Sequence, residues 1–258
     1  MIQEFRIDRF RLLFDLEPEN FESDRNLLWY AQNRQVPEPE VIHVMLRALK
    51  ARDNAIDAGA NVGFFTVLMS KLVGDGGKVL AVEPDAKNVA KLKKNLDANS
   101  CGNVEVLACA LGGHSGTGKL YRVSDNGQSS LYGDGEPACA VQIGTLNGAL
   151  LHLPRRPAFM KMDIEGSEMD ALRGCSDLPP IVVCEANAPA LERAGSNVRT
   201  MVGWMRDQGY GAYVPHASGV VPSLIQSGQK VKPTRENANL LFAWRSHLVK
   251  HLWPEVEL

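Results

Sequence analysis

The segment Ala55–Phe65, AIDAGANVGFF, decides the fold of this chain. It starts as a short apolar strand, continues as a turn of small residues and ends where a helix begins. Gly59 and Gly63 allow a ligand to approach the backbone closely, and the free N–H groups near Phe64 face the polar end of such a ligand. The segment therefore predicts a nucleotide-binding turn between a first strand and a first helix, with a tight turn that binds nothing as the alternative.

The spacing of residues in this turn favours one class of ligand. A dinucleotide fingerprint has the pattern G-x-G-x-x-G, whereas this chain has Asp57-x-Gly59-x-Asn61-x-Gly63, with a carboxylate at the strand end. Asp57 favours the ammonium group of a methionine, directly or through water, but repels a pyrophosphate. We therefore expect S-adenosylmethionine as the cofactor, with S-adenosylhomocysteine as its product. An NAD-dependent oxidoreductase and a non-catalytic nucleotide-binding module are the alternatives.

A second acidic position follows the next apolar run, where the sequence reads Val82-Glu83-Pro84-Asp85. A carboxylate at this strand end can accept both hydroxyls of a ribose, a role that NAD enzymes share. Glu83 and Pro84 are therefore expected cofactor contacts. The alternative role for Glu83 is to cap the following helix, which Asp85 can do equally well.

A third segment, Ala108–Gly113, offers only small and apolar groups after the third apolar run. Such groups suit the packing of a flat adenine ring, so we expect Ala110 and Leu111 to contact the cofactor. A plain strand exit explains this segment equally well.

From Asn54 onward, short apolar runs alternate with longer amphipathic stretches, which is typical of βαβ units. This alternation predicts a doubly wound α/β sheet, closed by a β-hairpin. The expected strands are 54–58, 78–82, 104–108, 159–162, 181–184, 210–214 and 240–244. The expected helices are 39–49, 64–72, 88–98 and 197–208.

The first residues differ in character from the rest of the chain. Residues 1–37 are charged and aromatic without a clean period. We expect residues 1–50 to form an N-terminal extension that caps the sheet edge or the site, and residues 51–258 to form the cofactor-binding domain.

Composition excludes several classes of partner. The chain has 28 Lys and Arg against 30 Asp and Glu, so it lacks the basic excess that binds nucleic acid. No stretch is apolar enough to span a bilayer, and the charged N-terminus does not resemble a signal peptide. An odd number of cysteines without C-x-x-C spacing argues against disulfides and structural zinc. The five cysteines are therefore expected to be buried, reduced thiols of a cytoplasmic protein without integral membrane contact.

Four segments resemble the FkbM family of S-adenosylmethionine-dependent methyltransferases. They are Pro37-Glu38-Pro39-Glu40, Asp57–Gly63, Val82–Asp85 and, most specifically, Lys161–Glu168 with the sequence KMDIEGSE. The resemblance covers roughly residues 37–244. It includes a Gln128–Leu131 loop similar to the family's Ser-Ser-Leu, which implies a cofactor contact at Ser130. Where the family tends to have Thr-Leu-Asp, this chain has Thr145-Leu146-Asn147.

The resemblance implies a Rossmann-like, mostly parallel sheet with an antiparallel C-terminal strand. It also implies methyl transfer to a hydroxyl of a sugar or natural-product small molecule. An aliphatic hydroxyl is a weak nucleophile, so a base within hydrogen-bond reach is expected at the carboxyl ends of the strands. Asp163 and Glu165, which follow the fourth strand, are the expected catalytic pair, and Asp163 is also an expected cofactor contact. A turn carboxylate is the alternative role for Glu165, and Glu185 is a weaker candidate base.

The sequence predicts no metal site, because it has no H-x-x-x-H pair among its scattered histidines. Two loops, 124–137 and 217–233, are expected to determine the acceptor. Neither loop contains a pattern that identifies it.

Overall fold

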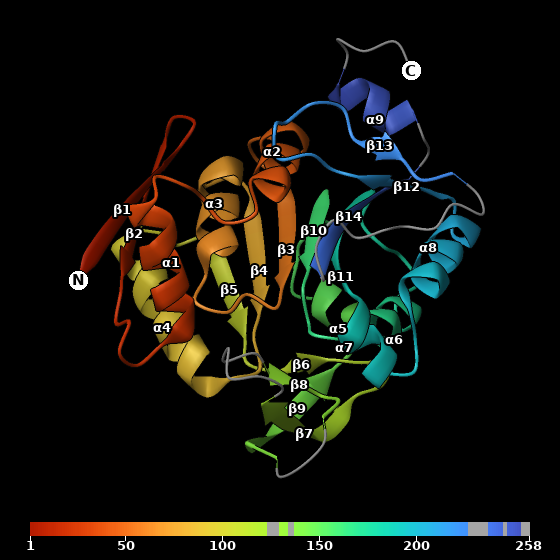
Figure 1. Cartoon of the computed structure of the whole chain (residues 1–258), viewed down its shortest axis with the longest axis horizontal. Coiled ribbons are helices and arrows are strands. Elements are labelled where there is room, and N and C mark those ends of the chain that lie inside the picture. The colour runs from red at the N-terminus through yellow and green to blue at the C-terminus, as the bar shows by residue number, and fades with distance from the viewer. Residues whose placement is uncertain (123–128, 134–136, 227–236, 245–246, 254–258) are drawn as a thin grey trace.

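The computed structural model of the chain describes residues 1–122, 129–133, 137–226, 237–244 and 247–253. Its centre is a sheet of order β13-β12-β14-β11-β10-β3-β4-β5 (Figure 1). The strands are β3 Asn54–Ala58, β4 Lys78–Val82, β5 Val104–Leu107, β10 Phe159–Met162, β11 Ile181–Asn187, β12 Tyr210–Val214, β13 Ser223–Leu224 and β14 Asn237–Trp244.

Strand directions confirm the expected doubly wound sheet. Strands β11, β10, β3, β4 and β5 are mutually parallel, whereas β14 runs antiparallel to both β11 and β12. The C-terminal strand therefore lies between two others in reverse orientation, as the family resemblance implies. The pairing of β11 with β14 continues to Asn187 opposite Asn237, so both strands are longer than their apolar residues alone indicate.

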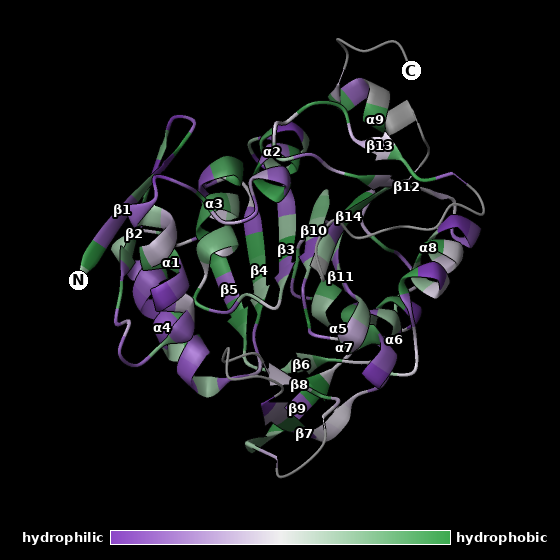
Figure 2. Cartoon of the chain, in the orientation of Figure 1, coloured by the Kyte–Doolittle hydropathy of each residue, from purple (hydrophilic) through white to green (hydrophobic). Residues whose placement is uncertain are grey.

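Helices cover both faces of this sheet, because successive strand residues point to opposite sides. In β3, Ala55 packs into one hydrophobic cluster and Ile56 into the other. The first face is covered by α2 Pro39–Ala48, α3 Phe64–Val73 and α4 Ala86–Ala98, and the second by α5 Leu146–Leu150, α6 Glu168–Arg173, α7 Ala188–Arg193 and α8 Val198–Asp207. Figure 2 shows hydrophobic residues gathered in the central strands and a hydrophilic surface on α4.

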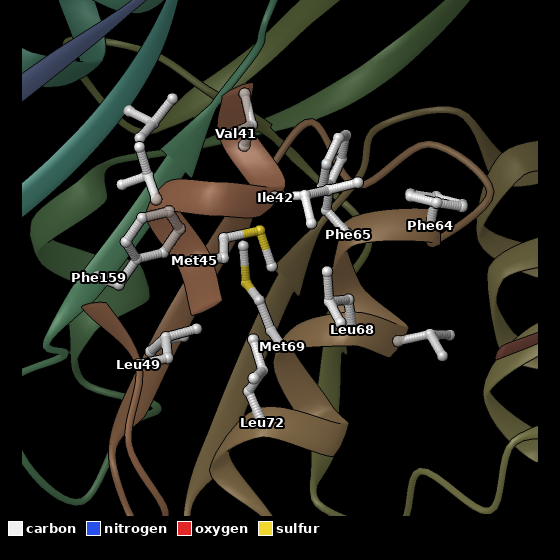
Figure 3. Close-up of a cluster of buried hydrophobic side chains, with 14 of the residues drawn as sticks. Val41, Ile42, Met45, Leu49, Phe64, Phe65, Leu68, Met69, Leu72 and Phe159 are labelled. Atoms are coloured by element: carbon white, nitrogen blue, oxygen red, sulfur yellow. The ribbon is translucent and has the colours of Figure 1, made fainter. Parts of the chain in front are cut away.

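The cluster on the first face fixes the start of α3. Met45 of α2, Met69 of α3 and Phe159 of β10 pack together there (Figure 3). Phe65 and Leu68 belong to the same cluster and are almost completely buried. Because α3 begins directly after residues 59–63, which we call the glycine-rich turn, this packing also holds the turn in place.

The N-terminal extension contains regular structure that its irregular sequence pattern did not reveal. Strands β1 Ile2–Ile7 and β2 Phe10–Asp15 form a hairpin, and α1 Glu22–Gln32 follows. The hairpin and α1 lie beside α4 in Figure 1. The buried Lys91 of α4 pairs with Asp24 and Glu17, each at 3.0 Å. This ion-pair network attaches the start of α1 to the core.

A second, small sheet has the order β6-β9-β7-β8 and was not expected from the sequence. Its strands are β6 Ala110–Leu111, β7 Gly116–Arg122, β8 Ser129–Ser130 and β9 Cys139–Gly144. It starts just after β5 and lies at the bottom of Figure 1, apart from the central sheet. Residues 124–128, 134–136 and 227–233 of the two expected acceptor loops lie outside the described residues. The remaining helix, α9 His247–Leu252, lies near the C-terminus.

The expectation of five buried thiols was wrong in part. All five cysteines are free, but only Cys101 and Cys184 are buried, whereas Cys139 is exposed. Within the described residues, no helix combines the length and the hydrophobicity needed to cross a membrane.

Candidate functional site

A cavity of about 290 Å³ opens where β3, β4 and β10 end. Its lining comes from several segments that lie far apart in the chain. They are 59–65, 82–84, 109–111, 163–165, parts of α1, and residues 37 and 38. The expected site residues that line it are Gly59, Asn61, Gly63, Phe64, Glu83, Pro84, Ala110, Leu111, Asp163 and Glu165; Asp57 and Ser130 do not line it.

The glycine-rich turn has the left-handed backbone that its small residues predict. The φ angles are +84° at Gly59, +50° at Asn61 and +94° at Gly63. The N–H groups of Gly59 and Ala60 both donate to the carbonyl of Val82, at 2.9 and 3.0 Å. A Cβ at Gly59 would lie 1.7 Å from the carbonyl oxygen of Asp163. The turn is therefore fixed between the ends of β4 and β10.

Glu83 is anchored by backbone groups at the cavity wall. Its carboxylate accepts the N–H of Asn61 at 2.8 Å and the N–H of Asp85 at 2.9 Å. Asp85 instead caps α4, because its side chain accepts from the N–H groups of Lys87 and Asn88. Burial raises the pKa of Glu83 to about 7, against the effect of its backbone hydrogen bonds. The capping alternative for Glu83 is thus filled by Asp85.

Apolar side chains form another part of the cavity lining. Cys109, Ala110 and Leu111 form it together with Leu131. Ser130, between these segments, turns its hydroxyl away from the cavity and donates to the carbonyl oxygen of Glu165 at 2.6 Å. Its observed role is to hold the loop that carries Glu165.

Asp57 lies beneath the turn and not in the cavity. Its side chain is buried, and it accepts a hydrogen bond from the Thr66 hydroxyl at 2.5 Å. Burial raises the pKa of Asp57, and the nearby Lys161 opposes this shift. Any effect of Asp57 on a ligand therefore acts through the turn or through its charge.

Lys161 is the buried cation of the site, and the sequence analysis gave it no role. Its Nζ lies 3.0 Å from Asp163 Oδ2 and 4.7 Å from the ring centroid of Phe65. Burial acts to lower the pKa of Lys161, but the negative charges of Asp163, Glu38 and Asp57 raise it above its usual value. Burial likewise opposes ionisation of Asp163, but Lys161 outweighs it and lowers the pKa of that carboxyl. The pair is therefore ionised at neutral pH.

The segment after β10 carries two acidic residues, Glu165 and Glu168, with different surroundings. Glu168 accepts the N–H groups of Ile164 and Gly166, at 3.0 and 2.9 Å, and so shapes the loop. Glu165 has a φ of +54° and lines the cavity. Burial, together with the charge of Asp163, raises the pKa of Glu165 to about 8. The turn carboxylate is therefore Glu168, and Glu165 remains available to a ligand.

Three carboxylates gather at this edge of the sheet. Each of Asp163, Glu165 and Glu185 offers an oxygen within 4.8 Å of the other two. Oxygen ligands of this kind suit Mg²⁺ or Ca²⁺, although such clusters also occur without an ion. Burial and the charge of Asp163 raise the pKa of Glu185 well above its usual range. The raised pKa favours the protonated, uncharged form of Glu185, which lessens the repulsion among the three carboxylates.

The N-terminal segment supplies cavity residues that sequence reasoning missed. Ser23, Asn26 and Tyr30 of α1 line the cavity, and the Ser23 hydroxyl donates to Asn61 Oδ1 at 2.7 Å. Glu38, which precedes α2, lines it as well. The only available signal was the presence of Glu38 in a segment that resembles the family. The histidines at 114, 152 and 216 do not line the cavity.

Comparison with known proteins matches the chain to one family of methyltransferases. The family model of the "Methyltransferase FkbM domain" matches residues 57–211. "Methyltransferase 1" of Beauveria bassiana is 26% identical over 179 residues, which cover 57% of this chain and 72% of that protein. The crystal structure of methyltransferase FkbM from Methylobacillus flagellatus is similar in fold, with a TM-score of 0.50 and 16% identity. That match covers 86% of this chain but only 59% of the other. The chain belongs to the FkbM methyltransferase family.

Proposed function

We propose that this protein transfers the methyl group of S-adenosylmethionine to a hydroxyl of a small molecule, such as a sugar or a natural product. One observation carries the proposal: the glycine-rich turn, the Glu83 carboxylate and the carboxylates of Asp163 and Glu165 line one cavity. The first two groups suit an adenosine cofactor, and the last two offer hydrogen-bond partners to the hydroxyl of an acceptor. When bound, the cofactor supplies an activated methyl group.

The cofactor end of the cavity fits this assignment. A carboxylate has about four lone-pair sites. Among the described residues, the Glu83 carboxylate receives two backbone N–H groups and the Asn88 amide, the last at 3.3 Å. It therefore retains capacity for a ribose hydroxyl. The apolar wall of Ala110 and Leu111 suits a flat base, and the small turn residues allow close approach.

The acceptor end is bounded by charged and polar side chains. Lys161 keeps Asp163 ionised, and Glu165 and the polar residues of α1 lie around the same space. Hydroxyl groups of a small acceptor find hydrogen-bond partners there. The balanced charge of the chain gives no basic surface excess for a nucleic-acid acceptor.

The assignment is tested by binding first and by transfer second. Calorimetry should show binding of S-adenosylmethionine and S-adenosylhomocysteine but not of NAD. The protein is then incubated with tritiated S-adenosylmethionine and a panel of methyl glycosides, hydroxylated macrolactones, primary amines and carboxylic acids. We expect transfer to a hydroxylated member, seen as a mass gain of one methyl group. Preferential binding of NAD would support an oxidoreductase instead, and cofactor binding without any transfer would support a non-catalytic module.

Replacing Glu83 by alanine should weaken cofactor binding at least tenfold. The change removes a charged acceptor of hydrogen bonds, each worth about 1.5 to 3 kcal/mol. It also releases the N–H of Asn61 in the turn. Calorimetry with S-adenosylhomocysteine measures the effect, and Asp85→Ala, which removes the α4 cap outside the cavity, is the control. Unchanged affinity in a folded Glu83→Ala variant would show that the ribose assignment is wrong.

We expect transfer to proceed without a divalent metal. Lys161 supplies a positive charge to Asp163, and the raised pKa of Glu185 favours its uncharged form, so the negative charge of the cluster is reduced without a cation. Activity should be the same after dialysis against EDTA as before it. Loss of activity in EDTA, restored by Mg²⁺, would instead make Asp163, Glu165 and Glu185 the first residues to test as ligands.

A further inference from the structure

Glu38 lines the cavity and shares Lys161 with Asp163, the first residue of the loop that follows β10. It lies between Pro37 and Pro39 and immediately precedes α2. Its backbone is left-handed, with φ +40° and ψ +63°, which is uncommon for a residue with a side chain and disfavoured before proline. It lines the cavity together with Pro37. The strained backbone thus holds a carboxylate at the cavity wall.

Two groups hold the Glu38 side chain in place. The amide of Asn239, on β14, donates to Glu38 Oε2 at 3.1 Å, and Lys161 Nζ lies 4.0 Å from the same oxygen. The side chain is surrounded by protein but keeps 32% of its surface exposed, because it faces the cavity. It is therefore both fixed in position and accessible to a ligand.

The charged groups around Glu38 lie on β10, in the loop after β10 and on α2. Burial raises the pKa of Glu38 to about 7, Lys161 on β10 acts to lower it, and the charges of Asp163 and Glu40 raise it. A base is most effective when its pKa lies near the working pH. Glu38 meets this condition at neutral pH.

The other two candidate bases are less well matched. Asp163 is bound to Lys161 at 3.0 Å, and its lowered pKa makes it a weak proton acceptor. Glu165, with a pKa of about 8, is largely protonated at pH 7, and its Oε2 already accepts from Asn187 at 3.3 Å. Glu38 also accepts one amide hydrogen bond, from Asn239, but a larger fraction of it than of Glu165 is ionised at pH 7. Lys161 lies 4.0 Å from Glu38, against 3.0 Å from Asp163.

We infer that Glu38, in the part of the cavity wall formed by the N-terminal segment, is the catalytic base that takes the proton of the acceptor hydroxyl. The inference rests on the proposed methyltransferase function. As the acceptor oxygen forms its bond to the methyl carbon, the methyl–sulfur bond breaks and its electron pair stays on sulfur. The O–H proton passes to the Glu38 carboxylate and then to solvent. Lys161 and Asp163 position the carboxylate and the acceptor.

Glu38→Gln tests this role, and Glu40→Gln is the matched control. Glu40 is on the same turn and also accepts from Asn239, at 3.1 Å, but it does not line the cavity. The assay uses the best acceptor of the panel above or, without an organic acceptor, the release of methanol when water takes its place. We expect kcat of Glu38→Gln to fall about 100-fold or more, with affinity for S-adenosylhomocysteine unchanged. Glu40→Gln should keep the wild-type kcat on the alkaline plateau, with its rising limb at slightly lower pH, because the charge of Glu40 raises the pKa of Glu38.

The pH dependence gives a second readout. Glu38 accepts a proton only when ionised, so kcat should rise as the pH increases through about 7 and level off above it. Glu38→Asp should retain a rising limb at reduced kcat, whereas Glu38→Gln should lose it. Independently of activity, ¹³C NMR of glutamate-labelled protein should show a carboxyl titration near pH 7, beside those of Glu83 and Glu168, that disappears in Glu38→Gln and persists in Glu40→Gln.

The outcomes separate the two proposals. A wild-type protein that binds no S-adenosylmethionine, or transfers to no acceptor and not to water, overturns the proposed function and this inference with it. A wild-type protein that transfers methyl groups while Glu38→Gln keeps its kcat and its pH limb overturns the inference alone. If kcat of Glu38→Gln falls but its rising limb against pH remains, Glu38 has a structural role, and that outcome also contradicts the inference.

Discussion

Replacing Gly59 by valine should abolish cofactor binding and destabilise the fold by about 4 kcal/mol or more, one of the larger effects a single substitution produces. A Cβ there would lie 1.7 Å from the carbonyl oxygen and 2.8 Å from the carbonyl carbon of Asp163. Both atoms are backbone, so no side chain can rotate away. The φ of +84° adds strain, because β-branched residues rarely adopt it. The turn must therefore separate from the loop after β10.

Gly74→Val is the matched control for this change. Gly74 also has a positive φ, +62°, but nothing lies within 4 Å of the Cβ position. It therefore measures the backbone strain without the collision. Thermal unfolding and calorimetry with S-adenosylhomocysteine should show a stability loss of about 1 to 3 kcal/mol and full binding for Gly74→Val, whose φ of +62° and ψ of −173° favour glycine. Gly59→Val should lose both its stability and its binding. Wild-type affinity in a folded Gly59→Val variant would exclude the turn from the site.

The central sheet could be predicted because its strands are buried on both faces. Residues 54–58, 78–82 and 159–162 read as short apolar runs, and the structure has strands with the same limits. The ends of β11 and β14 could not be read in this way, because they are held by pairing between strands and not by hydrophobicity. The hairpin β1–β2 and the small sheet were missed for a related reason: their strands are partly exposed, so no continuous apolar run marks them.

The cavity could be predicted where local sequence sets the local backbone. The glycine-rich turn and the residues directly after strands, such as Glu83 and Asp163, fall into this class, because parallel strands bring their carboxyl ends to one edge. Tertiary packing decides the rest. The side chain of Asp57 points toward Thr66 of α3, from which it accepts a hydrogen bond. The hydroxyl of Ser130 points toward the carbonyl of Glu165, to which it donates one. Glu38 and Lys161 meet only because α2 packs across the first face of the sheet.

Asp163→Asn should lower turnover about 100-fold while leaving cofactor affinity nearly unchanged, the pattern of an interaction made mainly in the transition state. The substitution keeps the shape of the side chain but removes the charge that Lys161 Nζ contacts at 3.0 Å. We expect a stability loss of about 1.5 to 3 kcal/mol, the worth of a hydrogen bond between charged groups. The loss stays limited because Glu38 and Asp57 also stabilise the charge of Lys161.

The pH dependence of Asp163→Asn should distinguish the role of Asp163 from that of Glu38. The negative charge of Asp163 contributes to the raised pKa of Glu38, whereas Lys161 lowers it. Without Asp163 the attraction of Lys161 is less opposed, so the pKa of Glu38 should fall and the rising limb of kcat should move below pH 7. Glu165→Gln should be tested alone and together with Asp163→Asn. Non-additive losses of activity in the double variant would show that Asp163 and Glu165 act as a unit. If Asp163 were itself the base, its replacement would remove the rising limb and not shift it. Loss of binding to S-adenosylhomocysteine would make Asp163 a cofactor ligand, because then its charge is needed before any proton moves.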